Sequence, residues 1–189
     1  LLTNTVYGEI LDIAFDQNKE TKWNEIFKVR LYKSAHYTFV MPLTIGAILG
    51  GADEKILKAI ETYGENIGLA FQLRDDELGV FGDSSLTGKS NFSDITEGKK
   101  TLLYFKTLES TSLRQKDFFT KHYGVKDLSS KKLEKIRKIM KDSEALGYSQ
   151  KVSRKLLVKG KKSISQMTNI PNLQDTLSNM ADYMIMREN

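Results

Sequence analysis

Hydrophobic positions along most of the chain recur three and four residues apart, which is the spacing of one face of an α-helix. This pattern predicts one helix over residues 3–17, a second from about Thr21 to Ala35, and a third from Asp53 to about Val80. Further helices are predicted over residues 99–109, 114–122, 129–146, 148–168 and 173–187. We therefore expect an all-α protein.

Residues 37–49 are apolar on every side, which is typical of a helix at the centre of a bundle. The longest apolar run, "FVMPLTIGAILGG" from Phe39, contains a proline and three glycines. It is shorter than the ~20 residues that a membrane span needs. The sequence therefore predicts a buried core helix here and no transmembrane segment.

Two residues are predicted to mark helix ends, and one segment is predicted to be a loop. Asp53 is a plausible N-cap for the helix that follows it, and Gly147 a plausible glycine after a helix C-terminus. Residues 82–98 are polar and rich in Gly, Ser, Thr and Asp, which is typical of a loop. Long loops inside a domain are usually functional or disordered. No repeat, linker or domain boundary is evident, so we expect a single helical domain or part of one.

Composition excludes some kinds of site and raises one alternative. The 189 residues include no cysteine, so disulfides and thiolate metal sites are excluded. There are only two histidines, and they lie far apart in the chain. Residues 121–162 carry 14 Lys and Arg against 4 Asp and Glu. Such a region can bind nucleic acid or anionic lipid. Its lysines alternate with apolar residues at helical spacing, however, which favours a solvated helix face and no nucleic-acid partner.

The stretch "FQLRDDELGVFGD" carries the strongest chemical signal. On a helix, Gln72, Asp75, Asp76 and Gly79 fall on one face. Two adjacent carboxylates in an apolar setting are costly unless a cation joins them, and an oxygen-only pair suits Mg²⁺. Taken alone, such a pair on a helix is usually only part of a solvated charged face.

Lysines that could bind phosphate groups follow directly. Lys89 lies in "TGKS", and Lys99 and Lys100 lie in "EGKKT". The "TGKS" string lacks the upstream glycine of a P-loop and follows no strand, so it is not a nucleotide motif. An acidic helix end followed by a basic loop is nevertheless what a metal–diphosphate site requires.

These stretches together resemble the second aspartate-rich region of the trans-isoprenyl diphosphate synthases, the polyprenyl synthetase family. That region has the form FQ-x-x-DD-x-x-D, then G-D, G-K and D-[IL]-x-x-G-K-x-T, against "FQLRDDELGVFGD" and "TGKSNFSDITEGKKT" here. "GEILDI" at 8–13 is similar to the family's G-Q-x-x-D-[LI] helix. "YKSAHYTFVMPLTIGAILGGA" at 32–52 is similar to its K-T-x-x-[YF]-[TS]-x-x-x-P-L-x-x-G-A segment, and "YMIMREN" to its closing helix. The resemblance spans the chain in order.

The resemblance implies an all-α fold of antiparallel helices around a deep central cavity. It implies a prenyltransferase that condenses isopentenyl diphosphate with an allylic diphosphate, of the geranylgeranyl or farnesyl diphosphate synthase type. It also implies Mg²⁺ as cofactor, a homodimer and a cytoplasmic location. The amino terminus has no basic flank ahead of an apolar stretch, so a signal peptide is not expected.

The resemblance also implies roles for individual residues. The expected metal-binding residues are Asp75, directly, Asp76, through water, and Asp12 in a supporting position. The expected ligands of the allylic diphosphate are Lys33, Lys89 and Lys99. The residues expected to face the developing allylic cation are Lys33, Ser34 and Gln72.

The sequence departs from the family pattern at four positions. Gly79 replaces the third aspartate of the motif, so metal support there is expected to be missing or to come from water. Glu9 replaces a glutamine and adds a charge, Ser34 replaces threonine and keeps the hydroxyl, and Phe92 stands where glycine is common.

The family's first aspartate-rich motif, DDxxD or DDxxxxD, is not found upstream of "GEILDI". We therefore interpret residues 1–189 as the C-terminal portion of one synthase domain, incomplete at its N-terminus, and expect it to be inactive alone. One alternative is a non-catalytic partner subunit of a heteromeric prenyl diphosphate synthase. Another is a helical binding module that uses the basic 121–162 surface on nucleic acid or anionic lipid.

Overall fold

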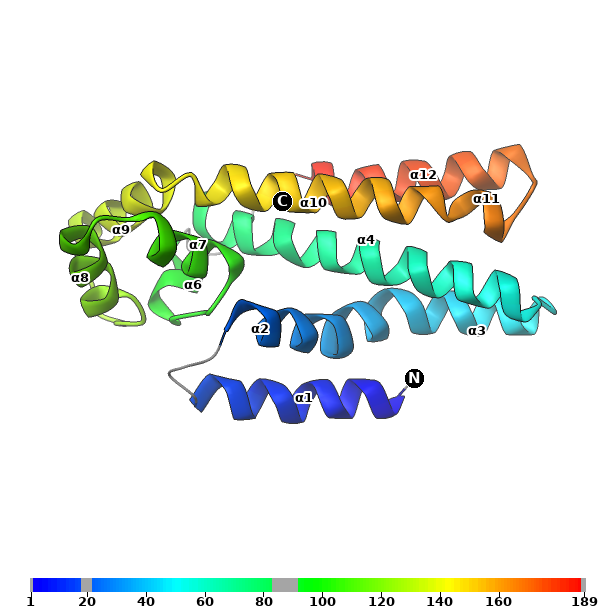
Figure 1. Ribbon diagram of the computed structural model, residues 1–189, viewed down its shortest axis with the longest axis horizontal. Helices are drawn as coiled ribbons and strands as arrows, with labels where there is room; N and C mark the ends of the chain where they lie inside the picture. Colours follow the sequence, from blue (N-terminus) through cyan, green and yellow to red (C-terminus); the bar gives the residue numbers. More distant parts are fainter. Residues whose placement is uncertain (1, 18–21, 83–91, 188–189) are drawn as a thin grey trace. The chain divides into compact units, whose positions relative to one another are not determined.

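The computed structural model describes residues 2–17, 22–82 and 92–187, and every regular element in these ranges is a helix (Figure 1). The all-α prediction is therefore confirmed. The chain divides into two compact units. Of the described residues, the first unit comprises 2–17, 22–72 and 152–187, and the second comprises 73–82 and 92–151. Two long helices, α4 (Glu54–Phe81) and α10 (Ala145–Lys162), contribute to both units.

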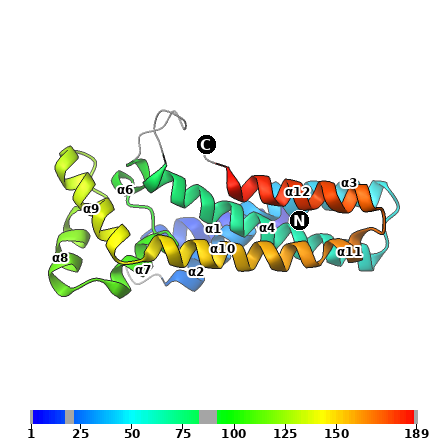
Figure 2. The same ribbon diagram turned by 90° about the horizontal axis from the view of Figure 1, so that it is seen from above.

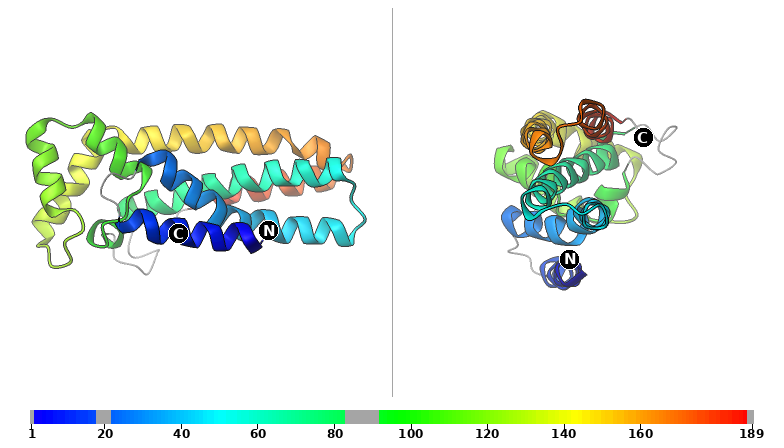
Figure 3. Two further views of the ribbon diagram at one scale, coloured as in Figure 1. Left: turned by 60° about the horizontal axis from the view of Figure 1, so that its bottom comes forward. Right: turned by 90° about the vertical axis from the view of Figure 1, so that its right-hand side faces the viewer.

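The first unit is a stack of helices, seen end-on in Figure 3. α1 (Leu2–Gln17) forms one outer layer. The next layer is the continuous run of α2 (Trp23–Val29), η1 (Arg30–Val40) and α3 (Met41–Leu49). α4 lies beyond this run and is covered by α10 and by α12 (Pro171–Met186) (Figure 2). The short helix α11 (Ile164–Met167) lies between α10 and α12 in the chain.

The run from Trp23 to Leu49 has no break, so the prediction of two separate helices divided after Ala35 is wrong. Instead, residues 30–40 form a π-helix, in which each N–H bonds to the carbonyl five residues back. At its end the N–H of Met41 donates to the carbonyl of His36. Pro42 has no N–H to donate, and the return from π to α hydrogen bonding falls at this proline.

Two glycines bring α4 close to η1. A Cβ atom built on Gly68 would lie 2.6 Å from the Cβ of Ala35, and one built on Gly64 would lie 3.0 Å from the Cα of Val40. The first distance is shorter than real Cβ atoms show and the second is tighter than nearly all of them, so glycine at both positions permits this approach. Ala35 and Val40 are buried as a result.

α3 does not form the buried core helix that its composition predicts. None of its residues is buried, and Ile45, Ile48 and Leu49 are exposed. Within the described residues only the side of α3 next to α4 is covered, with Leu43 packed against the core of Tyr63, Ile67 and the α11–α12 residues. α1 likewise exposes an apolar stripe, which consists of Leu2, Val6, Ile10 and Ile13.

The second unit is a small helical cluster around its own core. It contains the end of α4, α6 (Ser93–Thr96), α7 (Leu102–Ser110), α8 (Leu113–His122), α9 (Ser130–Asp142) and the start of α10. Its buried residues are Val80, Ile95, Leu103, Phe119, Ile136, Ile139, Met140 and Ala145. α9 buries one apolar face here and exposes Lys131, Lys132, Lys135 and Lys138, as predicted for a solvated helix face.

The predicted helix ends are right at Asp53 and wrong at Gly147. The Asp53 carboxylate accepts a hydrogen bond from the N–H of Ile56 at 2.8 Å, which is an N-cap interaction. Gly147, in contrast, lies inside α10. The chain turns between α9 and α10 at Glu144, which adopts a left-handed φ of 58°. The single-domain interpretation stays a prediction.

Candidate functional site

The acidic end of α4 carries the predicted metal-binding pair. Asp75 is half-buried and Asp76 is buried, with 4% of its surface exposed. Gly79 follows within one turn, so it shares a face with both aspartates. The next residue after the pair, Glu77, is also buried. Its carboxylate accepts a hydrogen bond from the Ser149 hydroxyl at 2.7 Å and forms an ion pair with Arg74 at 3.2 Å. These contacts hold the Glu77 carboxylate in place and assign it a structural role.

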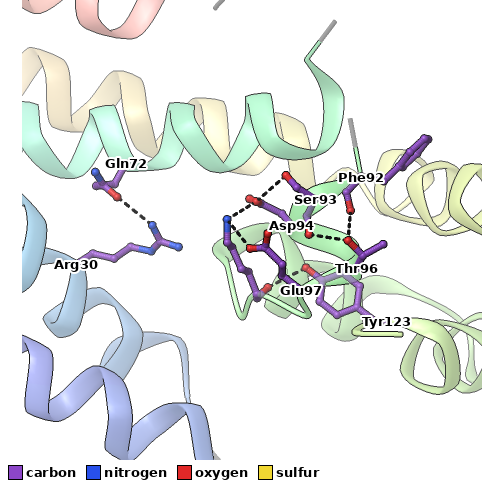
Figure 4. Close-up of polar contacts among 9 residues, drawn as sticks. Arg30, Gln72, Phe92, Ser93, Asp94, Thr96, Glu97 and Tyr123 are labelled. Atoms are coloured by element: carbon purple, nitrogen blue, oxygen red, sulfur yellow. Dashed lines mark hydrogen bonds and ion pairs between the residues drawn. The ribbon is translucent and has the colours of Figure 1, made fainter. Parts of the chain in front are cut away.

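Lys99, one of the predicted diphosphate ligands, lies just after α6. Its Nζ lies 2.5 Å from Oδ1 of Asp94 and 3.3 Å from Oε2 of Glu97 (Figure 4). The backbone of Lys99 is fixed as well, because its carbonyl accepts a hydrogen bond from the hydroxyl of Tyr123 at 2.8 Å. Burial lowers the pKa of Lys99, but its hydrogen bonds and charge interactions with Asp94 and Glu97 raise it above the usual value. Lys99 is therefore a held, fully charged ammonium group.

Asp94 was not among the predicted site residues, although it lies within the resemblance motif. Its carboxylate is buried, with 4% of the residue exposed, and it lies against Gly79 of α4. Gly79 and Asp94 meet only in the folded chain, so their spacing in the sequence does not predict this contact.

In the first unit, η1 carries Lys33 and Ser34. The Nζ of Lys33 lies 2.7 Å from Oδ2 of Asp12 and 3.0 Å from Oε2 of Glu9, both on α1. The hydrogen bond that Lys33 donates to Asp12 is the largest influence on the pKa of Lys33, which is raised above its usual value although burial opposes the shift. The structure thus brings Asp12 to Lys33, and the extra charge of Glu9 reinforces the same contact. Ser34 is half-buried beside Lys33.

Gln72 is oriented by a residue that the sequence analysis missed. The Nη1 of Arg30 donates a hydrogen bond of 3.3 Å to Oε1 of Gln72 (Figure 4). This contact joins the start of η1 to α4 across 42 residues of sequence. Because Arg30 occupies the amide oxygen, it fixes which way the side-chain amide of Gln72 points.

A buried histidine ties three helices of the first unit together. Nε2 of His36 lies 3.0 Å from Oε1 of Glu65 on α4, and its Nδ1 lies 3.3 Å from the side-chain nitrogen of Asn4 on α1. Only 3% of His36 is exposed. These contacts hold α1 and α4 against the π-helix that carries Lys33.

The donor set at the end of α4 fits a divalent ion that keeps several waters. Two carboxylates with no cysteine or histidine ligand are the chemistry that Mg²⁺ accepts, usually together with substrate phosphates. Among the described residues no three acidic or histidine side chains converge as a complete metal cage. The structure shows Asp75 and Asp76 together on α4 in the second unit, with Lys99 in the same unit, and Lys33, Asp12 and Gln72 in the first. Lys89 lies outside the described residues.

None of the described helices combines the length and the apolar composition that crossing a membrane requires.

Comparisons with known proteins agree with the motifs. The chain is 32% identical over 181 residues to geranylgeranyl diphosphate synthase of Sulfolobus acidocaldarius, which covers 95% of this chain and 54% of that protein. It is 30% identical over 181 residues to short chain isoprenyl diphosphate synthase of Methanothermobacter thermautotrophicus, with 96% and 54% covered. The chain thus spans about half the length of these curated relatives.

A solved structure gives the same result. The crystal structure of geranylgeranyl pyrophosphate synthase from Corynebacterium glutamicum, complexed with isoprenyl diphosphate and magnesium, is similar with a TM-score of 0.90 at 29% identity. The match covers 98% of this chain and 52% of that one. The family profile for polyprenyl synthetase matches residues 1–141. On this evidence, together with the acidic end of α4, the chain belongs to the polyprenyl synthetase family.

Proposed function

We propose that the chain supplies the second aspartate-rich half of the active site of a prenyl diphosphate synthase. The reaction joins an allylic diphosphate to isopentenyl diphosphate: the allylic C–O bond breaks, a new C–C bond forms, and pyrophosphate and a proton leave. The observation that carries the proposal is the pair Asp75 and Asp76 on the last turns of α4, in a family member whose motif continues to Lys99.

Asp75 and Asp76 would hold Mg²⁺ at the diphosphate. When bound, the ion neutralises negative charge that grows on the diphosphate as the C–O bond breaks. Asp76 is buried and keeps its place, whereas Asp75 is half-buried and accessible, which suits direct binding by Asp75 and support by Asp76. Asp12 would support the site through its contact with Lys33.

Lys33, Lys89 and Lys99 would bind the allylic diphosphate. The pKa values of Lys33 and Lys99 are raised by the carboxylates that hold them, so both groups are cationic at neutral pH. Fixed ammonium groups aimed at developing charge stabilise it without reorganisation during the reaction. Ser34 and Gln72 would face the allylic cation, and Arg30 would keep the amide of Gln72 in one orientation.

The test uses the protein expressed from the complete gene. We expect Mg²⁺-dependent consumption of isopentenyl diphosphate with an allylic diphosphate, and a loss of at least about a hundredfold in Asp75→Ala because charge stabilisation is a large part of such catalysis. Asp142→Ala, which removes an exposed aspartate at the end of α9, is the matched control and should retain full turnover. Normal turnover in Asp75→Ala would show that the metal assignment is wrong.

We further propose that residues 1–189 alone do not turn over substrate and that the protein acts as a homodimer. The exposed apolar stripe of α1 supports association, because an exposed apolar patch often marks an interaction site. Light scattering on the complete gene product checks the dimer. Turnover by residues 1–189 alone would contradict the first part.

The heteromeric alternative has a separate test. A non-catalytic partner subunit would show no turnover as a pure protein and would raise the activity of a second prenyl synthase chain upon mixing. The intact pair Asp75 and Asp76 favours the catalytic proposal, since a non-catalytic subunit has no need of it.

A further inference from the structure

Gly79 lies where the family motif places a third aspartate, and the structure shows what fills the space. A Cβ atom built on Gly79 would lie 2.6 Å from Cγ and 2.9 Å from Oδ1 of Asp94. No side chain of any kind therefore fits at residue 79 while Asp94 keeps its position. The Asp94 carboxylate takes up the volume that a third aspartate on α4 would enter first.

Asp94 is held in that place by several contacts. It belongs to α6, whose neighbouring residue Ile95 is completely buried in the core of the second unit. The carbonyl of Asp94 accepts a hydrogen bond from the N–H of Lys99 at 3.0 Å, and its Oδ1 accepts one from Nζ of Lys99 at 2.5 Å. Lys99 is thus tied to Asp94 by both its backbone and its side chain.

We infer that Gly79 and Asp94 act as one unit, in which the glycine admits the Asp94 carboxylate to the acidic face of α4 and Asp94 positions the ammonium group of Lys99 there. The carboxylate beside residue 79 then belongs to α6 instead of α4. Asp94 is a positioning residue, since it acts through Lys99. The link to diphosphate binding rests on the proposed function, whereas the contact between the two residues does not.

The inference changes the expected effect of restoring the family pattern. In Gly79→Asp the new side chain would meet Asp94 directly, and two carboxylates in contact repel each other and oppose ionisation. One of them must move, and Lys99 moves with Asp94. The substitution is therefore expected to disturb the site although it recreates the familiar motif.

The first test measures the reactivity of Lys99 toward an amine-acylating reagent, site by site, by mass spectrometry. Only the neutral amine reacts, so a lysine that loses its carboxylate partner reacts faster. We expect Asp94→Asn, which keeps the size of the side chain, to accelerate acylation of Lys99 by about threefold or more because the stabilising charge is gone. Gly79→Ala should accelerate it as well, because the methyl group displaces Asp94. The exposed Lys116 on α8 serves as the internal reference.

The matched control is Gly147→Ala. Gly147 is also helical and belongs to the same unit, but a Cβ atom there meets nothing within 4 Å. Its replacement should leave the acylation of Lys99 unchanged and raise the midpoint of thermal unfolding slightly, because alanine favours helix. Gly79→Ala should lower that midpoint. Unchanged reactivity of Lys99 in Asp94→Asn, or a Gly79→Ala protein that behaves like Gly147→Ala, would overturn the inference.

A second measurement connects the pair to the reaction. In the complete gene product, Asp94→Asn should raise KM for the allylic diphosphate more than it lowers kcat, because Lys99 is still present but no longer held. A kcat loss with unchanged KM would contradict a positioning role. If the unaltered protein shows no prenyl transfer, the proposed function fails, but the acylation experiment still decides whether Gly79 and Asp94 hold Lys99.

Discussion

Tyr63 on α4 makes the stability of the first unit sensitive to alkaline pH. Only 4% of this residue is exposed, and its hydroxyl donates a hydrogen bond of 2.7 Å to the carbonyl of Leu177 on α12. Burial, and to a smaller extent the negative charge of Asp182, raise the pKa of Tyr63 from 10.0 to about 12. The phenol therefore stays neutral in the folded protein at pH values where it ionises in the unfolded chain.

The sign and size of the effect follow from these two pKa values. Because the folded pKa is the higher one, the contribution of Tyr63 is complete below pH 10 and is lost as the pH rises towards 12. Between pH 9 and pH 11 the loss amounts to about 1.3 kcal/mol of unfolding free energy, since one pKa unit corresponds to about 1.4 kcal/mol. Tyr63→Phe keeps the ring but removes the titrating group and its hydrogen bond.

Denaturant unfolding at pH 8, 9, 10 and 11 measures the difference between the unaltered chain and Tyr63→Phe. At pH 8 the variant should be less stable by about 0.5–1.5 kcal/mol, the usual value of one hydrogen bond. By pH 11 this difference should vanish or change sign. Tyr37→Phe, at an exposed tyrosine, is the matched control and should leave the pH dependence as it is. A difference between the unaltered chain and Tyr63→Phe that stays constant from pH 8 to pH 11 would refute the reasoning.

Two further predictions concern packing and buried charge. Ser149→Ala removes a hydrogen bond to the buried carboxylate of Glu77 and should lower the unfolding free energy by about 1.5–3 kcal/mol. The double variant Ser149→Ala/Glu77→Gln should lose less unfolding free energy than the sum of the losses in the two single variants, because the two side chains interact. Gly68→Ala places a methyl group 2.6 Å from the Cβ of Ala35 and should destabilise by about 1–3 kcal/mol, measured by urea unfolding. Gly46→Ala on α3, where the added Cβ atom meets nothing within 4 Å, should be neutral or stabilising and would expose an error in this packing argument if it proved equally harmful.

Periodicity predicts most of the helices because their buried faces follow a local rule. α1 and α4 begin and end within a residue or two of their predicted bounds, and Asp53 caps as expected. The break between α9 and α10 is different. It depends on Glu144 in a left-handed conformation, which a glutamate seldom adopts, so the nearby Gly147 was the natural but wrong choice.

The π-helix and the exposure of α3 could not be predicted from local pattern. A π-helix has no sequence signature in a window of apolar and polar residues, and Pro42 marks only its end. An apolar segment is predicted to be buried because burial stabilises it, but the sequence alone does not say what covers it. In the described residues α3 is covered on one side only.

The same distinction between local pattern and tertiary contact applies to the candidate site. The motif residues Asp75, Asp76 and Gln72 could be placed on one helix face from their spacing, and the structure has all three on α4. Their partners could not be found in this way, because Arg30 reaches Gln72 and Asp94 reaches Gly79 only after the chain has folded. The predicted roles of these residues in binding metal and diphosphate stay predictions.

The π-helix has a consequence for the tolerance of this region to insertions and deletions. Residues five apart, such as Ala35 and Val40, share a face of a π-helix, whereas five residues of an α-helix turn by about 140° beyond one full turn. A deletion outside residues 35–40 that returned the segment to an α-helix would therefore separate the two side chains. Ala35 and Val40 could then no longer both face Gly68 and Gly64, where the backbones approach most closely. The number of residues between Trp23 and Leu49 is therefore fixed by the glycines of α4, and homologous sequences that preserve these glycines should align with η1 without gaps.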